Sequence, residues 1–335
     1  MKFSVGYQLR EQDDFLDSII RCKECINEVY FSWGDFANGR NSQIRQSGML
    51  PWEAQRKQEE DLKRLSGAGL RFNLLFNATC YGKDSQSRAF FEKIGETVDY
   101  IQHTVGLQGV TTTSLLIARF IHDNFSGIDV RASVNMSIGS AEAMDYVKDL
   151  FDSFYLKREL NRDIKRILEL KEWCNENGKE IYGLANSGCL NDCPAHIFHD
   201  NLVSHESEIA AMDNGYSFEG ICRQFMKSKE NLGQLLDRMN FIRPEDVCHY
   251  EGVFPALKLA TRVSPCPIRI LKAYAEDHSY KGNVLDLLEP NHSVALYPKL
   301  VENEKIQSRL MNGRLKYEGL EEALMTLNSE GDMLC

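Results

Sequence analysis

Short apolar runs alternate with longer stretches of helical periodicity about eight times along this chain. The runs are rich in β-branched and aromatic residues and are too short for helices, which is typical of buried strands. We expect strands at Lys2–Tyr7, Glu28–Trp33, Arg71–Asn77, Val110–Thr113, Asp129–Asn135, Ser153–Arg158, Glu180–Asn186 and Ala256–Arg262. We expect helices over 12–25, 52–66, 86–97, 114–124, 140–149, 161–178, 195–240 and 267–278.

This alternation predicts a parallel sheet, because parallel strands are joined by helical crossovers. Eight such units closing on themselves form a (β/α)8 TIM-like barrel, and residues 1–285 have a suitable length for it. A doubly wound open sheet is the alternative, but no glycine-rich phosphate loop follows the first strand. We therefore predict an α/β protein built on a (β/α)8 barrel.

Two segments do not fit a minimal barrel. Residues 187–250, after the seventh strand, are too long for an ordinary connection and contain no strong strand pattern, so we expect an insert at the active-site end. Residues 286–335 carry two short helical patterns, near 302–311 and 317–327. They predict a C-terminal helical extension packed on the barrel.

Charged residues at the ends of strands are candidates for catalysis. Arg158 ends the sixth predicted strand, Glu159 follows it, and Arg262 ends the eighth. The carboxyl ends of barrel strands converge on the face that holds active sites, and charges beside apolar strands need partners. In the insert, His199 and Asp200 are adjacent and are candidates for general acid/base work, although solvent-facing or capping roles are the alternative.

Composition and charge limit the expected cellular location and the expected binding partners. The beginning of the sequence has no apolar signal-peptide core, and no stretch approaches the length of a membrane span, so we expect a cytoplasmic protein without membrane contact. The net charge of −10 disfavours a broad nucleic-acid surface. A small-molecule substrate is therefore favoured over tRNA, and a homo- or hetero-oligomer stays open.

Four cysteines lie on the insert: Cys189, Cys193, Cys222 and Cys248. In a cytoplasmic protein, clustered cysteines more often bind metal or do chemistry than form disulfides. Four thiolates are the usual complement of an iron–sulfur cluster or a structural zinc, and Cys266 is an alternative ligand. The competing interpretation is four unrelated buried thiols, because free cysteine is often buried.

Two stretches of the sequence resemble the peptidase U32 family. The first runs from Arg131-Ala-Ser-Val-Asn-Met136 to Leu156-Lys-Arg-Glu-Leu160. The second runs from Glu245-Asp-Val-Cys248 to Pro255-Ala-Leu-Lys-Leu-Ala-Thr-Arg262. Ser187-Gly-Cys-Leu-Asn-Asp-Cys193 replaces the family's H-G-x-x-C pattern, so the chain resembles a divergent member.

The resemblance implies a (β/α)8 barrel with a [4Fe–4S] cluster held by Cys189, Cys193, Cys222 and Cys248. It also implies oxygen-independent hydroxylation, which relatives perform on tRNA uridine or on a quinone precursor. We therefore predict an iron–sulfur oxidoreductase acting on a small molecule or a nucleobase. The alternatives are a peptidase, for which the sequence shows no H-E-x-x-H or local nucleophile motif, and a non-catalytic, cluster-bearing subunit of a hetero-oligomer.

Overall fold

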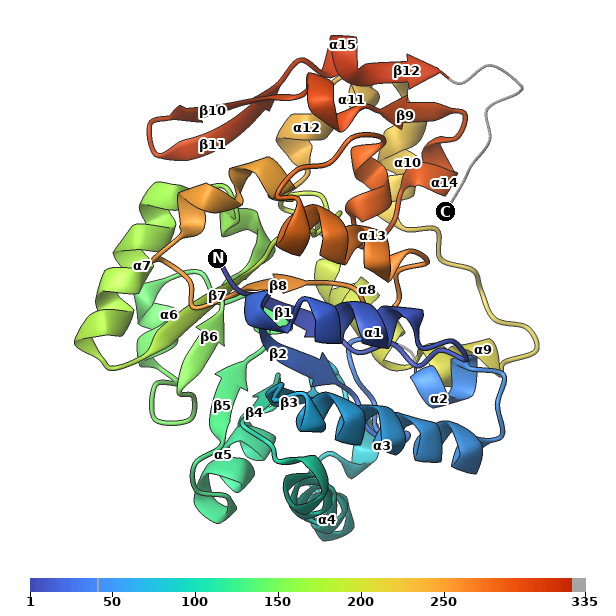
Figure 1. The fold of residues 1–335 in the computed structure, drawn as a ribbon, viewed down its shortest axis with the longest axis vertical. Helices are drawn as coiled ribbons and strands as arrows, with labels where there is room; N and C mark the ends of the chain where they lie inside the picture. Colours follow the sequence, from blue (N-terminus) through green and yellow to red (C-terminus); the bar gives the residue numbers. More distant parts are fainter. Residues whose placement is uncertain (41, 327–335) are drawn as a thin grey trace.

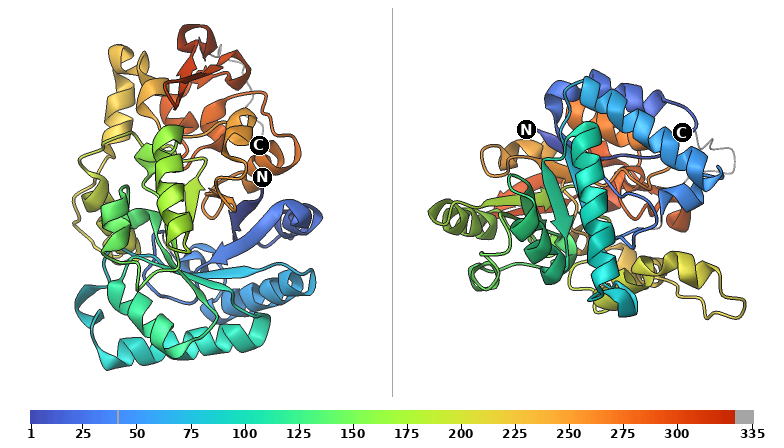
Figure 2. Two further views of the ribbon diagram at one scale, coloured as in Figure 1. Left: turned by 90° about the vertical axis from the view of Figure 1, so that its left-hand side faces the viewer. Right: turned by 90° about the horizontal axis from the view of Figure 1, so that it is seen from below.

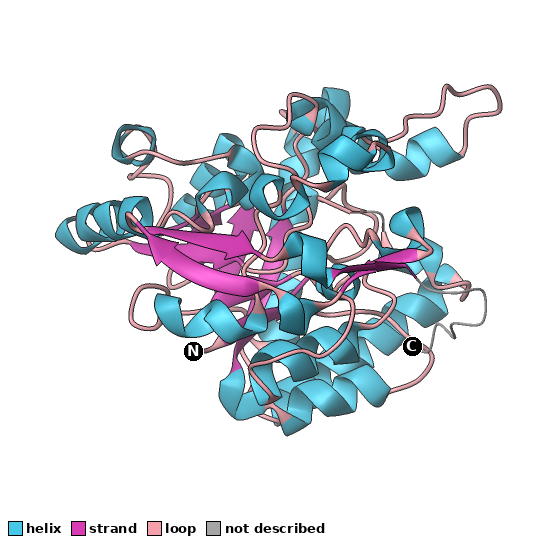
Figure 3. Ribbon diagram, turned by 90° about the horizontal axis from the view of Figure 1, so that it is seen from above, coloured by secondary structure: helices cyan, strands magenta, loops and turns pink. Residues whose placement is uncertain are grey.

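A closed barrel of eight parallel strands forms the centre of the protein (Figures 1 and 3). The computed structural model describes residues 1–40 and 42–326. The barrel strands are β1 Phe3–Gly6, β2 Ile26–Phe31, β3 Phe72–Phe76, β4 Gly109–Thr112, β5 Asp129–Ala132, β6 Ser153–Tyr155, β7 Glu180–Leu184 and β8 Leu257–Leu259. Pairing of β1 with β8 closes the ring, with Ser4 opposite Lys258. The predicted (β/α)8 fold and its eight strands are confirmed.

Helices surround the strands, as the sequence periodicity predicts (Figure 2). Around the barrel they are α1 Asp14–Arg21, α2 Gln43–Gln46, α3 Pro51–Gly67, α4 Arg88–Val105, α5 Leu115–Asn124, α6 Ala141–Asp145, α7 Ile164–Glu176 and α13 Pro267–Leu271. In the part of the chain that the structure describes, no helix has the length and apolar character needed to cross a bilayer.

Helix α4 shows how local signals set these elements. The Ser87 side chain accepts a hydrogen bond from the Phe90 N–H and so caps the first turn. The sequence prediction stopped at residue 97, but Val98 and Ile101 continue the buried face to Val105. Gly106, with a φ of +77°, then ends the helix.

The barrel interior contains a buried ion pair. The Arg131 Nη1 on β5 lies 2.6 Å from the Glu28 Oε1 on β2, and both side chains are buried. The Tyr182 ring on β7 lies 3.9 Å from the Arg131 guanidinium carbon. Ser4 donates a further hydrogen bond to Glu28. This pair of opposite charges in the barrel is also hydrogen-bonded, as buried charges need to be.

The insert after β7 consists mainly of short helices. They are α8 His196–Ser204, α9 Glu206–Ala210, α10 Ile221–Lys227, α11 Lys229–Leu232 and α12 Leu235–Arg238, followed by the 3-10 helix η5 Pro244–Tyr250. At the end of α8, the Ser204 hydroxyl accepts a hydrogen bond from the Thr79 N–H, beyond β3. The first part of the insert therefore lies against the carboxyl ends of the strands, as expected.

In its described part, the C-terminal extension has more residues in strands than in α-helices. The helical pattern predicted near 302–311 is wrong, and the one near 317–327 holds only one short helix. Strands β10 Gln307–Met311 and β11 Arg314–Glu318 form a hairpin, and β9 Lys299–Val301 pairs with β12 Leu324–Thr326. The described α-helices here are only α14 Ser293–Leu296 and α15 Leu320–Ala323, and the 3-10 helix η8 Asn303–Lys305 precedes β10. Asn312 and Gly313 take positive φ angles of 52° and 77°, which is the tight hairpin turn favoured by Asn-Gly. Buried Leu315 and Tyr317 follow the strand period of two.

The extension is joined to the barrel at the start of the insert. Its first helix, the 3-10 helix η7 Val284–Leu287, spans the predicted boundary at residue 285. The Gly188 N–H donates to the Glu289 carbonyl, and the Glu289 N–H donates to the Asn186 carbonyl. A Cβ at Gly188 would lie 2.5 Å from the Pro290 carbonyl oxygen, so only glycine allows this approach. The extension thus places Glu289 beside the carboxyl end of β7.

Candidate functional site

A cationic cavity opens at the carboxyl ends of the strands. It encloses about 470 Å³, part of it open to solvent. Its charged lining consists of Arg40, Arg158, Lys258, Arg262 and Glu289. Glu289 is the one carboxylate among the described lining residues, so positive charge dominates the cavity.

Arg40 and Glu289 form an ion pair at the edge of the cavity. The Arg40 Nη2 lies 2.8 Å from the Glu289 Oε1, and its Nε donates to the same oxygen at 3.0 Å. The loop that carries Arg40 is held by Asn77, whose Oδ1 accepts from the Gly39 N–H at 3.0 Å. One of the three arginines is therefore already neutralised by the extension.

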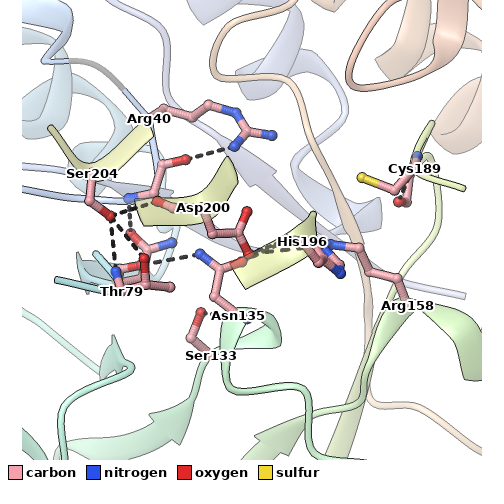
Figure 4. A network of polar contacts seen from close by, with 12 residues as sticks. Arg40, Thr79, Ser133, Asn135, Arg158, Cys189, His196, Asp200 and Ser204 are labelled. Carbon is pink, nitrogen blue, oxygen red and sulfur yellow. Dashed lines mark hydrogen bonds and ion pairs between the residues drawn. The ribbon is translucent and has the colours of Figure 1, made fainter. Parts of the chain in front are cut away.

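Arg158 and Arg262 have no comparable carboxylate partner. The Arg158 Nη2 donates to the Asn135 Oδ1 at 2.7 Å, while the Asp200 Oδ2 lies 4.0 Å away (Figure 4). The Arg262 Nη1 is buried and makes no hydrogen bond to any described residue. Burial lowers the pKa of Arg262 to about 10. An uncompensated buried guanidinium is unfavourable, so this site has an unmet requirement for an anion.

Lys258 on β8 lies in the same cavity with its side chain buried. Its Nζ stands 4.0 Å from the centre of the Tyr30 ring and 5.0 Å from that of Tyr155. Burial, and then the charge of Arg262, lower the pKa of Lys258 to about 7. Part of the lysine population is therefore neutral near pH 7.

The structure brings only some of the predicted catalytic residues together. Arg158 and Arg262 line the cavity, and Asp200 approaches Arg158 from α8. It is His196, and not His199, that faces Asp200, with its Nε2 3.8 Å from the Asp200 Oδ2 (Figure 4). The reason is helical spacing, because residues i and i+4 share a face while adjacent residues do not.

The other two predicted residues lie outside the cavity. The His199 ring packs 5.7 Å from the Phe218 ring, and burial lowers the pKa of His199. The Glu159 Oε1 lies 3.7 Å from the His196 Nδ1, and Glu159 lines a separate cavity beside Arg162. Their catalytic roles stay predictions.

Three of the four predicted cysteine ligands share one region. Cys189 and Cys193 lie in the loop after β7, and Cys222 lies in α10. Burial, together with the charges of Cys189 and Cys193, raises the pKa of Cys222. We call the part of the insert that holds Cys189, Cys193 and Cys222 the cysteine lobe. It belongs to the same insert whose first part lies against the carboxyl ends of the strands.

Cys248 is separate from the cysteine lobe. It is exposed on η5, where its thiol contacts the Glu245 carbonyl oxygen at 3.7 Å. The chain then reaches Glu251, which pairs with the N-terminus at the amino end of β1, 3.3 Å away. Over the described residues, no three or more Cys, His, Asp or Glu side chains are placed to hold a metal ion. The predicted four-cysteine set therefore does not fit a cluster in this arrangement.

Sequence reasoning assigned no role to Lys258 or Glu289. For Lys258 a signal exists, because a lysine between Leu257 and Leu259 interrupts a fully apolar strand. For Glu289 no local signal exists, because it lies 249 residues from Arg40 and meets it only in the fold.

The sequence matches no family model. It is 26% identical over 254 residues to "Uncharacterized protease MJ1657" of Methanocaldococcus jannaschii, covering 74% of this chain and 71% of that protein. The solved structure of the U32 peptidase Mk0906 superposes with a TM-score of 0.55 and 14% identity, covering 77% of this chain and 91% of that one. The chain is thus similar in sequence to a curated protease and shares its barrel fold with a U32 peptidase. Both similarities agree with the resemblance noted in the sequence.

Proposed function

We propose that this protein is an enzyme of the U32 type whose barrel mouth binds a small anionic substrate. The observation that carries the proposal is the buried Arg262 Nη1, which has no protein partner among the described residues. Arg158 faces the same cavity, so two guanidinium groups are available to one ligand. Guanidinium groups bind carboxylates and phosphates through paired, charge-assisted hydrogen bonds.

Calorimetric titration with small ligands tests this proposal. We expect pyruvate, succinate or inorganic phosphate to bind, and we expect lactamide, which lacks the charge, not to bind. Binding should weaken in the Arg158→Met variant and persist in Arg309→Met, an exposed arginine on β10 paired only with Glu318. Binding of no anion, or equal binding of lactamide, would contradict the proposal.

For the predicted iron–sulfur cluster, we propose a smaller set of cysteine ligands. We propose that any cluster is held mainly by the cysteine lobe, because Cys189 and Cys193 already influence Cys222. Iron–sulfur clusters are bound by cysteine thiolates, and they supply electron transfer when bound. The hydroxylation expected from the resemblance stays a prediction.

Anaerobic purification followed by iron and sulfide analysis tests the cluster. Cys193→Ala should lose most of the iron, whereas Cys248→Ala, its matched control on η5, should retain it. An equal loss from both variants would restore the original four-cysteine set. A wild-type protein containing zinc in place of iron would support the zinc alternative, and a metal-free protein would overturn both.

A second candidate is a peptidase with a cysteine nucleophile, since the two relatives are named a protease and a peptidase. The observation that favours it is a Cys80–His205–Glu208 arrangement beyond β3. A hydrogen bond from His205 lowers the pKa of Cys80, and the His205 Nδ1 lies 2.9 Å from the Glu208 Oε2. A thiol activated by a histidine, which is in turn oriented by a carboxylate, is the usual pattern of a cysteine nucleophile. Cys80 is distant in sequence from His205 and Glu208, so no single local motif contains all three.

Alkylation of the thiols measures this activation directly. We expect iodoacetamide to modify Cys80 several times faster than the partly buried Cys25, and His205→Gln to remove the difference. Hydrolysis of a fluorogenic peptide should then be lost in Cys80→Ala and retained in Cys25→Ala. Hydrolysis that survives Cys80→Ala would rule out this nucleophile.

A further inference from the structure

Lys258 is buried in the cavity without an acidic partner. Among the described residues, no carboxylate lies within ion-pair distance of its Nζ, and the nearby Glu28 is already paired with Arg131 at 2.6 Å. The faces of the Tyr30 and Tyr155 rings flank the amine at 4.0 and 5.0 Å. A buried lysine without an acidic partner is poorly stabilised in its charged form.

The charges around Lys258 act mostly in one direction. Arg262, Arg131 and Arg40 disfavour its protonated form, and Glu28 favours it. Together with burial, the largest cause, they lower its pKa to about 7. Desolvation and a neighbouring cation are the two means by which proteins make a lysine amine nucleophilic at neutral pH.

We propose that Lys258 is a catalytic nucleophile that forms an imine with the carbonyl carbon of a small oxo acid. The carboxylate of this substrate would be bound by Arg158 and Arg262, so the inference rests on the anionic-substrate function proposed above. The two arginines and Lys258 line one cavity. A substrate for this cavity therefore needs a carboxylate for the arginines and a carbonyl carbon for the lysine. An oxo acid has both groups in a single molecule.

The step needs no reagent besides the substrate. The Nζ lone pair attacks the carbonyl carbon, the C=O π pair moves to the oxygen, and a proton passes from the nitrogen to that oxygen. The hydroxyl of the resulting carbinolamine takes a proton from solvent and leaves as water, while the nitrogen lone pair forms the C=N bond of the protonated imine. The protonated imine is cationic, and the two tyrosine faces beside Nζ favour such a cation.

Borohydride trapping tests the proposal on the full-length protein. Incubation with pyruvate or 2-oxoglutarate and sodium borohydride should add the mass of the reduced adduct to the peptide that contains Lys258. Lactate has the carboxylate but no carbonyl, so it should leave no adduct and should compete with pyruvate. The adduct should disappear in Lys258→Met and remain in Lys63→Met, an exposed lysine on α3.

Trapping should also increase with pH through the region around pH 7, as the neutral amine becomes populated. A second readout is folding stability. The unfolded chain holds a proton on Lys258 up to its ordinary pKa of 10.5, whereas the native chain releases it near pH 7. Stability of the wild type relative to Lys258→Met should therefore rise between these pH values.

The two proposals fail in different ways. If calorimetry shows that pyruvate binds but no adduct forms at Lys258, the nucleophile is overturned and the anion site stands. If neither pyruvate nor lactate binds, the anionic-substrate function fails, and the imine fails with it. Adducts distributed only over exposed lysines would also overturn the inference. Peptide mapping of the wild type decides the question even if Lys258→Met does not fold.

Discussion

Replacing Arg262 with methionine is expected to abolish binding of small anions and to leave the folded protein at least as stable as the wild type. In the unliganded protein, the Arg262 Nη1 is buried without a partner, so its charge is a cost of folding. Methionine fills similar space without a charge. The same substitution removes the group that we expect to contact the ligand, and loss of a buried, hydrogen-bonded charge weakens binding by about 2–5 kcal/mol.

Calorimetry and chemical denaturation measure the two halves of this prediction. We expect Arg158→Met to weaken binding as well, but without a gain in stability, because Arg158 already donates to Asn135. The exposed Arg309→Met variant serves as the control for loss of one positive charge. A variant at Arg262 that unfolds more easily and still binds anions would show that this arginine is structural.

Replacing Arg131 with methionine is expected to destabilise the barrel by about 3–5 kcal/mol, the usual cost of removing one partner of a buried ion pair. The variant would leave the Glu28 carboxylate buried in the barrel, 2.6 Å from where the guanidinium stood. Most of the cost comes from this abandoned charge and not from the lost attraction. The Glu28→Gln, Arg131→Met double variant should therefore recover much of the stability.

Urea denaturation of the wild type, the single variant and the double variant tests this expectation. Arg166→Met is the matched control, since Arg166 forms an exposed ion pair with Glu169 on α7 and should change stability by less than about 1 kcal/mol. A double variant no more stable than Arg131→Met would show that packing against Tyr182, and not charge, governs this position.

Local sequence patterns are sufficient to predict most elements of the barrel. Strand β7, for example, is a short apolar run buried from Ile181 to Leu184, too short for a typical helix, and it is followed by the long insert. The hairpin of the extension was equally local, because Asn312-Gly313 between alternating residues specifies a tight turn. The helical pattern near 302–311 gave the wrong element there, because the turn pairs β10 with β11 instead.

Only some residues of the candidate site could be predicted from the sequence. Arg158 and Arg262 could be predicted, because strand ends converge on one face of any (β/α)8 barrel. The separation of Cys248 from the cysteine lobe could not be predicted, because spacing along an insert does not say at which end of the barrel each residue lies. The sequence prediction paired His199 with Asp200. The structure shows that His196 lies beside Asp200, because the two share one face of α8.

The sequence by itself therefore determined the barrel and the two arginines at its mouth, since both follow from periods and positions within single strands. Only the tertiary structure decided that Lys258 is an unpaired amine, that Glu289 neutralises Arg40, and that Arg262 lacks a partner. These properties depend on which charges meet across the closed barrel and its extension. Coulombic attraction and desolvation are set by distance in space, and distance in sequence does not fix them.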